Sequence, residues 1–164
     1  MKKFIAMLLA ALMVASMFAG CGAKEEAPAA DANAEAPAEV AGAIKLGMCG
    51  PLTGGAAVYG TAVQAGMQIA VEEINAKGGL QFALNTQDDE HDTEKAANAY
   101  NALKDWGMQI MAGPVTTAPS NVVAAECAAD EIFMLTPSAS GVAVIENGNN
   151  IFQICFTDPN QGVA

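Results

Sequence analysis

From residue 43 onward, short apolar runs alternate with stretches of helical periodicity, and this alternation constrains the fold more than any other feature of the chain. Strands separated by helices are typical of a parallel sheet that is covered by helices on both faces. The sequence therefore predicts an α/β fold. The expected strands are Ala43–Cys49, Phe82–Gln87, Met108–Ala112, Ile132–Leu135 and Ile151–Phe156.

The segments between these strands carry helix signals. Apolar residues recur at helical spacing from about Thr61 to Ile74, and Gly78 ends this first helix. Asp92 or Thr93 can cap a second helix, which runs to Trp106. A third helix begins in the Thr/Ser-rich segment after residue 114, and a short helical stretch opens at residues 136–140. Because no helix is expected after the loop at residues 157–161, we interpret the chain as a fragment or a shortened product.

The N-terminal part of the chain has a different composition. Two lysines, an apolar run over residues 4–18 and small residues before Cys21 indicate a secretory signal peptide over residues 1–20. The segment ending in Cys21 resembles the bacterial lipobox, which predicts acylation of that cysteine and a membrane anchor; an ordinary signal peptide cut elsewhere is the alternative. Residues 21–42 are rich in Ala, Glu and Pro and predict a flexible tether.

Charge and cysteine content exclude several classes of protein. The chain has no arginine, and five lysines against eighteen acidic residues remain after the signal peptide, which argues against nucleic-acid binding. The later cysteines, Cys49, Cys127 and Cys155, show no metal-ligand spacing and are interpreted as small buried thiols, so no metal site is predicted. His91, the single histidine, lies in the acidic run 88–92, which is interpreted as a solvated turn.

Catalysis has little support in this sequence. No dinucleotide-binding glycine motif follows the first strand, no phosphate-loop lysine is present, and no pair of nucleophile and base stands out. We therefore predict a protein that is not an enzyme and needs no cofactor.

Three loops that follow predicted strands carry the chemistry of interest: residues 50–59, 113–120 and 136–140. In an open parallel sheet, ligands bind outside the carboxyl ends of the strands, so these loops are expected to converge. Amide groups at a helix start attract an anion, and nearby hydroxyls can donate to a carboxylate and accept from an ammonium group. The loops predict a cradle for the head of an amino acid, although each hydroxyl taken singly could merely cap a helix.

Four segments, GPLTGGAAVYG, AVEEINAKGGL, AGPVTTAPS and LTPSAS, resemble the Leu/Ile/Val-binding family of periplasmic (type I) substrate-binding proteins. The similarity runs from about Ile44 to the end, with a gap of a few residues between Gly79 and Asp88. It implies a partial N-terminal lobe over residues 43–164, taken from a two-lobed clamp. Such a clamp delivers a small amino acid, branched-chain or similar, to the permease of an ABC importer outside the cytoplasm.

The resemblance also implies site residues. Tyr59 corresponds to an aromatic residue at the mouth of the cleft, and Thr117 to the hydroxyl that meets the ligand carboxylate. Ser138 is expected to direct its carbonyl toward the ammonium group, and Ser140 to contact the ligand's polar head through its hydroxyl and amide. Two apolar residues are expected to line the same place: Val115 and Ala139.

Some features depart from the family pattern. Many members carry paired cysteines where this chain has His91 and Thr116, so that disulfide is not expected here. In this family the second lobe supplies an acidic group for the ammonium and much of the side-chain pocket, so we expect weak or undetectable binding by this chain alone. The ligand stays open among leucine, other amino acids, small amides and urea. A sensory ectodomain of a receptor with the same fold is the alternative function.

Overall fold

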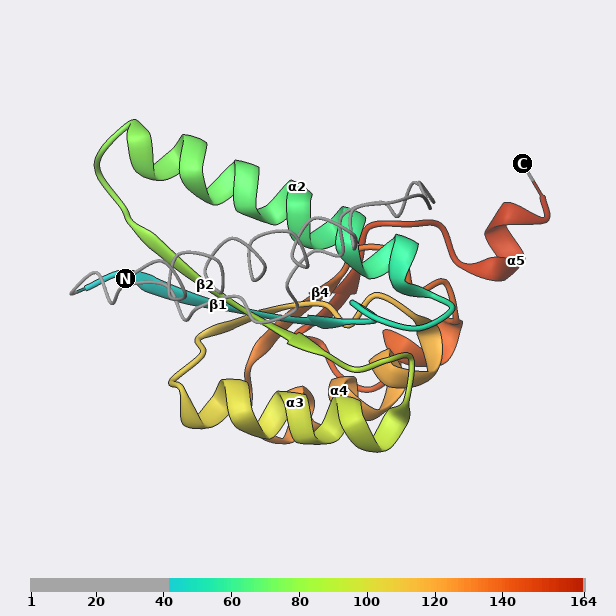
Figure 1. Ribbon diagram of the computed structural model, residues 1–164. Coiled ribbons are helices and arrows are strands. Elements are labelled where there is room, and N and C mark those ends of the chain that lie inside the picture. The colour runs from blue at the N-terminus through green and yellow to red at the C-terminus, as the bar shows by residue number, and fades with distance from the viewer. Residues whose placement is uncertain (1–41, 164) are drawn as a thin grey trace, which may run out of the picture. The chain divides into compact units, whose positions relative to one another are not determined.

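The computed structural model describes residues 42–163, which form a five-stranded parallel sheet in the order β2-β1-β3-β4-β5 (Figure 1). The signal peptide predicted at residues 1–20, the acylation of Cys21 and most of the predicted tether lie outside the described residues. The strands are β1 (Ile44–Gly50), β2 (Phe82–Asp88), β3 (Ile110–Ala112), β4 (Phe133–Thr136) and β5 (Ile151–Gln153). The helices are α2 (Ala57–Ala76), α3 (Thr93–Asp105), α4 (Thr117–Ala129), α5 (Asp158–Gln161) and the 3-10 helix η1 (Val142–Val144).

This architecture confirms the predicted α/β fold and all five strands, with changes at several ends. Helix α2 begins at Ala57, before the predicted start at Thr61. Strand β5 ends at Gln153 rather than Phe156, because it pairs only with β4 and its last partner there is Thr136. The segment 157–161, which was predicted to be a loop, contains the single helical turn of α5.

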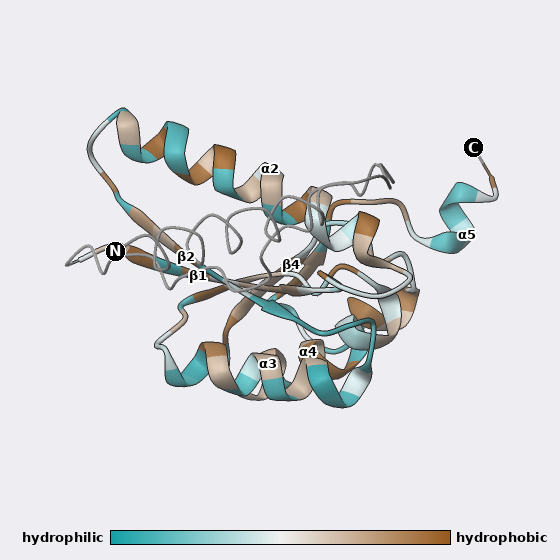
Figure 2. Ribbon diagram, in the orientation of Figure 1, coloured by the Kyte–Doolittle hydropathy of each residue, from teal (hydrophilic) through white to brown (hydrophobic). Residues whose placement is uncertain are grey.

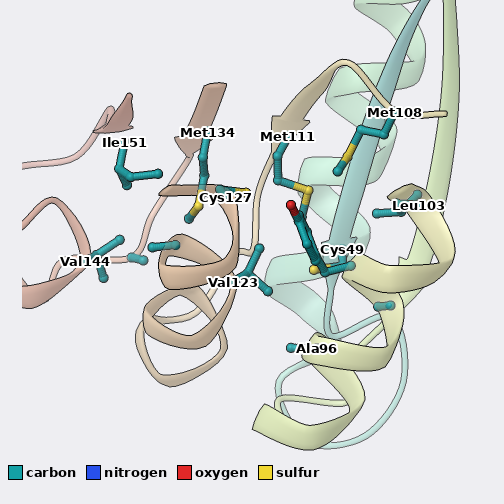
Figure 3. Close-up of a cluster of buried hydrophobic side chains, with 14 residues drawn as sticks. Cys49, Ala96, Leu103, Met108, Met111, Val123, Cys127, Met134, Val144 and Ile151 are labelled. Carbon is teal, nitrogen blue, oxygen red and sulfur yellow. The ribbon is translucent and has the colours of Figure 1, made fainter. Parts of the chain in front are cut away.

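Helices lie on both faces of the sheet, with α2 on one side and α3 and α4 on the other (Figure 1). On the α2 side, Met48 and Leu84 from the sheet pack against partly buried residues of the helix at positions 63, 67 and 71. The larger core fills the space between the sheet and the helices α3 and α4, and includes Leu103, Met111 and Met134 (Figure 3). These two cores hold α2 against one face of the sheet and α3 and α4 against the other.

Two of the cysteines belong to the larger core. Cys49 and Cys127 are fully buried, which confirms their interpretation as buried thiols, whereas Cys155 is only partly buried. Burial raises the pKa of the Cys127 thiol to about 12 and the pKa of Cys49 well above its ordinary value. Both thiols therefore stay protonated at neutral pH and act as small apolar groups.

The edge of the sheet formed by β4 and β5 leaves several apolar side chains exposed. The rings of Phe133 and Phe152 stack with their centroids 5.3 Å apart, and both are partly exposed. Figure 2 shows an apolar segment after β5, where Ile154 and Phe156 are exposed. Within residues 42–163, no helix combines the length and apolar character needed to cross a bilayer.

Candidate ligand-binding site

A cavity of about 530 Å³ lies where loops from the carboxyl ends of the strands meet. All five strands are parallel, so their carboxyl ends share one edge of the sheet, as the sequence predicts. The loops after β2, β3 and β4 and the first turns of α2 and α4 contribute to the wall. The lining residues are Tyr59, His91, Val115, Thr116, Thr117, Ala118, Asn121 and Ser138.

Four of the six predicted ligand residues meet at this cavity: Tyr59, Val115, Thr117 and Ser138. The other two do not belong to its wall. Ala139 is fully buried, and Ser140 is partly buried with its carbonyl accepting a hydrogen bond of 3.0 Å from the amide of Asp158. The structure thus brings together the residues of three separate loops, while the third loop turns inward after Ser138.

The loop after β1 is held by a carboxylate from the neighbouring strand. Asp88, the last residue of β2, accepts hydrogen bonds from the amide of Leu52 (2.8 Å) and from the hydroxyl of Thr53 (2.5 Å). The same carboxylate accepts from the amide of Glu90 at 2.9 Å. Partial burial alone would raise the pKa of Asp88, but these hydrogen bonds hold its pKa below the ordinary value. Asp88 therefore ties the loop that leads to Tyr59 to the turn after β2.

The depressed pKa of Asp88 predicts a dependence of stability on pH. A group whose pKa is lower in the folded state stabilises the fold above its unfolded pKa, about 3.9 for Asp. That contribution is lost as the pH falls through the folded value. Asp88→Asn should reduce the free energy of unfolding by about 1–2 kcal/mol at pH 7. Urea unfolding from pH 7 to pH 2.5 measures this difference.

The difference between the wild-type chain and Asp88→Asn should shrink as the pH falls through the lowered folded-state pKa of Asp88, because both side chains are uncharged below it. The pKa of Asp130 is also lowered, by hydrogen bonds from Lys104 and Tyr100, so acid destabilises both proteins through that residue. A difference that stays constant down to pH 2.5 would contradict the role given to the Asp88 carboxylate.

Buried hydroxyls connect the loops after β3 and β4. The carbonyl of Pro114 accepts hydrogen bonds from the hydroxyls of Ser120 (3.0 Å) and Thr136 (2.6 Å). The Thr136 hydroxyl also accepts from the amide of Ala139 at 3.2 Å, and the Ser138 hydroxyl donates to the carbonyl of Val115 at 2.6 Å. The hydroxyls of Ser120 and Thr136, which lie in two of the three predicted loops, therefore form hydrogen bonds within the protein.

The start of α4 leaves its first amides without a side-chain cap. Thr116 occupies the N-cap position in an extended conformation, yet its side chain makes no capping hydrogen bond. Amides in the first turn of a helix have no partner within the helix, and Pro119 has no amide hydrogen at all. The amides of Thr117 and Ala118, beside the Thr117 hydroxyl, are therefore suited to an anionic group at the cavity wall.

His91 is a site residue that the sequence analysis did not predict. It is exposed, as a turn residue should be, but it also lines the cavity, and its Nδ1 lies 2.8 Å from the hydroxyl oxygen of Thr116. The residues are 25 positions apart, on the loops after β2 and β3. The available signal was the family resemblance, which places paired cysteines at these two positions.

The acidic turn beside the cavity contains one buried carboxyl group. Asp89 is fully buried, and its Oδ1 accepts from the amide of His91 at 2.9 Å. Burial raises the pKa of Asp89, and the hydrogen bond from His91 opposes that shift. Figure 2 shows that the end of β2 and the following turn are hydrophilic. Among residues 42–163, no group of three or more His, Cys, Asp or Glu residues is placed to hold a metal ion.

Taken together, the fold and the cavity define an α/β lobe that can hold a small solute at the carboxyl edge of its sheet. A family model described as "Periplasmic binding protein" matches residues 43–164. The Leu/Ile/Val-binding protein BraC3 of Rhizobium johnstonii is 34% identical over 122 residues, which cover 72% of this chain and 33% of the relative. The leucine-, isoleucine-, valine-, threonine- and alanine-binding protein of Pseudomonas aeruginosa is 33% identical over 124 residues, covering 73% of this chain and 33% of the relative.

Solved structures show the same similarity. The branched-chain amino acid transporter substrate-binding protein LivJ of Streptococcus pneumoniae, in complex with isoleucine, superposes with a TM-score of 0.66 at 30% identity, covering 71% of this chain and 34% of LivJ. The leucine-binding protein LivK of Thermotoga maritima gives a TM-score of 0.67 at 30% identity, covering 73% of this chain and 34% of LivK. The chain belongs to the periplasmic binding protein family, and it spans about a third of the length of these relatives.

Proposed function

We propose that this chain forms part of the substrate-binding component of an ABC importer for branched-chain or similar small amino acids. The observation that carries the proposal is the uncapped start of α4, whose first residues, Thr117 and Ala118, line a cavity beside Tyr59. The ligands and transporter named for LivJ and the other relatives support the same conclusion. The proposal needs no catalytic group and no cofactor.

The proposed binding mode divides the polar head of the amino acid between two loops. The carboxylate would lie at the start of α4, where the positive end of the helix dipole and the Thr117 hydroxyl favour a negative charge. The ammonium group would lie beside the loop after β4. The Ser138 hydroxyl already donates to Val115, which leaves the carbonyl of Ser138 as the acceptor proposed for the ammonium. Tyr59, 61% exposed, would cover the ligand from the side of α2.

Ala139 and Ser140 have different places in this proposal. Ala139 is buried and would support the loop from behind without lining the cavity. Ser140 would reach the ligand only if the loop after Ser138 shifts, so we propose a smaller contribution from it than from Thr117. We also propose that the protein lies outside the cytoplasm and delivers its ligand to a membrane permease. An acylated Cys21 would anchor it to the membrane. No observation favours a sensory ectodomain over this function.

Binding is tested by NMR titration of the chain with leucine, isoleucine, valine, alanine and urea. We expect weak, saturable binding of branched-chain amino acids, with the largest shifts at the amides of Thr117 and Ala118. Thr117→Ala should weaken binding of leucine about tenfold, because a polar ligand atom would be left unpaired.

Thr61→Ala is the matched control, since the Thr61 hydroxyl donates to the carbonyl of Ala57 within α2 and Thr61 is not among the residues that line the cavity. This variant should bind leucine like the wild-type chain. Shifts confined to regions outside the cavity, or equal affinities for Thr117→Ala and the wild-type chain, would refute the proposed site.

A further inference from the structure

We propose that His91 is a positioning residue of the ligand site: its ring holds the Thr116 hydroxyl away from the first turn of α4, so that the amide of Ala118 stays open to the ligand. The inference rests on the proposed function for the identity of the ligand. It assigns to the acidic turn after β2 a role in binding that neither its composition nor its exposure indicates.

The first observation is the use of the Thr116 side chain. A threonine at the N-cap of a helix usually accepts a hydrogen bond from the second or third amide of the helix. The third residue of α4 is Pro119, which has no amide hydrogen, so Ala118 offers the single amide that Thr116 could cap. Thr116 does not make this bond and instead lies 2.8 Å from Nδ1 of His91. A hydroxyl can donate and accept at once, so the competition concerns position: where it contacts His91, the Thr116 oxygen does not accept from the amide of Ala118.

The second observation is that the turn after β2 is built to present His91. Glu90 and His91 have positive φ angles of 49° and 63°, which are uncommon for residues other than glycine. Hydrogen bonds from their amides to the carboxylates of Asp88 and Asp89, each 2.9 Å long, offset this strain. A further bond of 2.7 Å joins the amide of Asp92 to the carbonyl of Asp89. The turn therefore fixes the backbone of His91 rather than leaving it mobile.

Loss of the His91 ring should free the Thr116 hydroxyl to cap Ala118, and a ligand carboxylate would then have to displace that cap. An N-cap bond is strong enough to weaken binding by about fivefold. His91→Gly is the appropriate variant, because glycine adopts a positive φ without strain and the turn should keep its shape. His91→Asn is the rescue variant, because asparagine tolerates the same φ and carries a polar atom at the position of Nδ1.

The proposal makes a specific prediction for a double variant. His91→Gly should bind leucine about fivefold more weakly than the wild-type chain, and His91→Asn should stay within about twofold of it. His91→Gly/Thr116→Val should also return to within about twofold, because no hydroxyl is left to cap Ala118. NMR titration with leucine measures all four affinities, and circular dichroism confirms that each variant is folded. A double variant as weak as His91→Gly would overturn the proposal.

Amide hydrogen exchange at Ala118 tests the same competition without a ligand. In the wild-type chain this amide should exchange rapidly, and in His91→Gly it should exchange several-fold more slowly because the Thr116 hydroxyl caps it. Unchanged or faster exchange in His91→Gly would overturn the proposal even if leucine binds. Should the wild-type chain not respond to leucine, the proposed function fails on this chain, and the exchange rates still decide the role of His91.

Discussion

Gly60→Ala is expected to destabilise the fold by about 3 kcal/mol, at the upper end of the usual cost of overpacking. Gly60 is buried in the first turns of α2, where the helix crosses the loop after β1. A Cβ atom at this position would lie 2.1 Å from the carbonyl oxygen of Pro51 and 2.6 Å from its carbonyl carbon. Backbone atoms cannot rotate aside as a side chain can, so the helix or the loop has to move. Urea unfolding measures the loss.

Gly66→Ala in the same helix is the matched control. An added Cβ at Gly66 meets nothing within 4 Å, so the substitution should stabilise α2 by up to about 1 kcal/mol through helix propensity. Because Tyr59 adjoins Gly60, we also expect Gly60→Ala, but not Gly66→Ala, to alter the NMR signals of the cavity wall. Equal stabilities for the two variants would show that α2 does not depend on this close approach.

Thr136→Val is expected to cost about 3 kcal/mol, because it leaves a buried amide unpaired. The side chain of Thr136 is fully buried at the end of β4, where its hydroxyl donates to Pro114 and accepts from the amide of Ala139. Valine has a similar shape but cannot make either bond. Since these bonds join the loops after β3 and β4, the variant should also weaken leucine binding. Unfolding and titration measure the two effects.

Thr136→Ser separates the hydroxyl from the methyl group. Serine keeps both hydrogen bonds and loses one buried methyl group, which should cost about 1 kcal/mol. Its affinity for leucine should match that of the wild-type chain. A Thr136→Val variant as stable as the wild-type chain would instead show that the methyl group, and not the hydroxyl network, holds these loops together.

The part of the site that was predicted from the sequence depends on local signals and on chain direction. Strands that alternate with helices have to run parallel, so the loops carrying Tyr59, Thr117 and Ser138 converge at one edge. The hydrogen-bond partner of each hydroxyl group was not predictable from these signals. Whether Thr136 or Ser138 directs its hydroxyl to a ligand or to a carbonyl of the protein depends on the distance to the loop after β3, whose bonded residues lie 22 and 23 positions away in the sequence. Ser140 shows the same limit, since it does not line the cavity although Ser138, two residues earlier, does.

The sequence by itself determined the α/β class, the strand positions, the edge that carries the site and the family resemblance. All of these follow from periodicity, from glycine and capping signals and from short motifs, which act over a few residues. The tertiary structure alone decided that α2 approaches Pro51 closely enough to require Gly60, and that His91 meets Thr116 at 2.8 Å. Such contacts are set by how helices and loops pack on the sheet, and no local pattern in the chain encodes that packing.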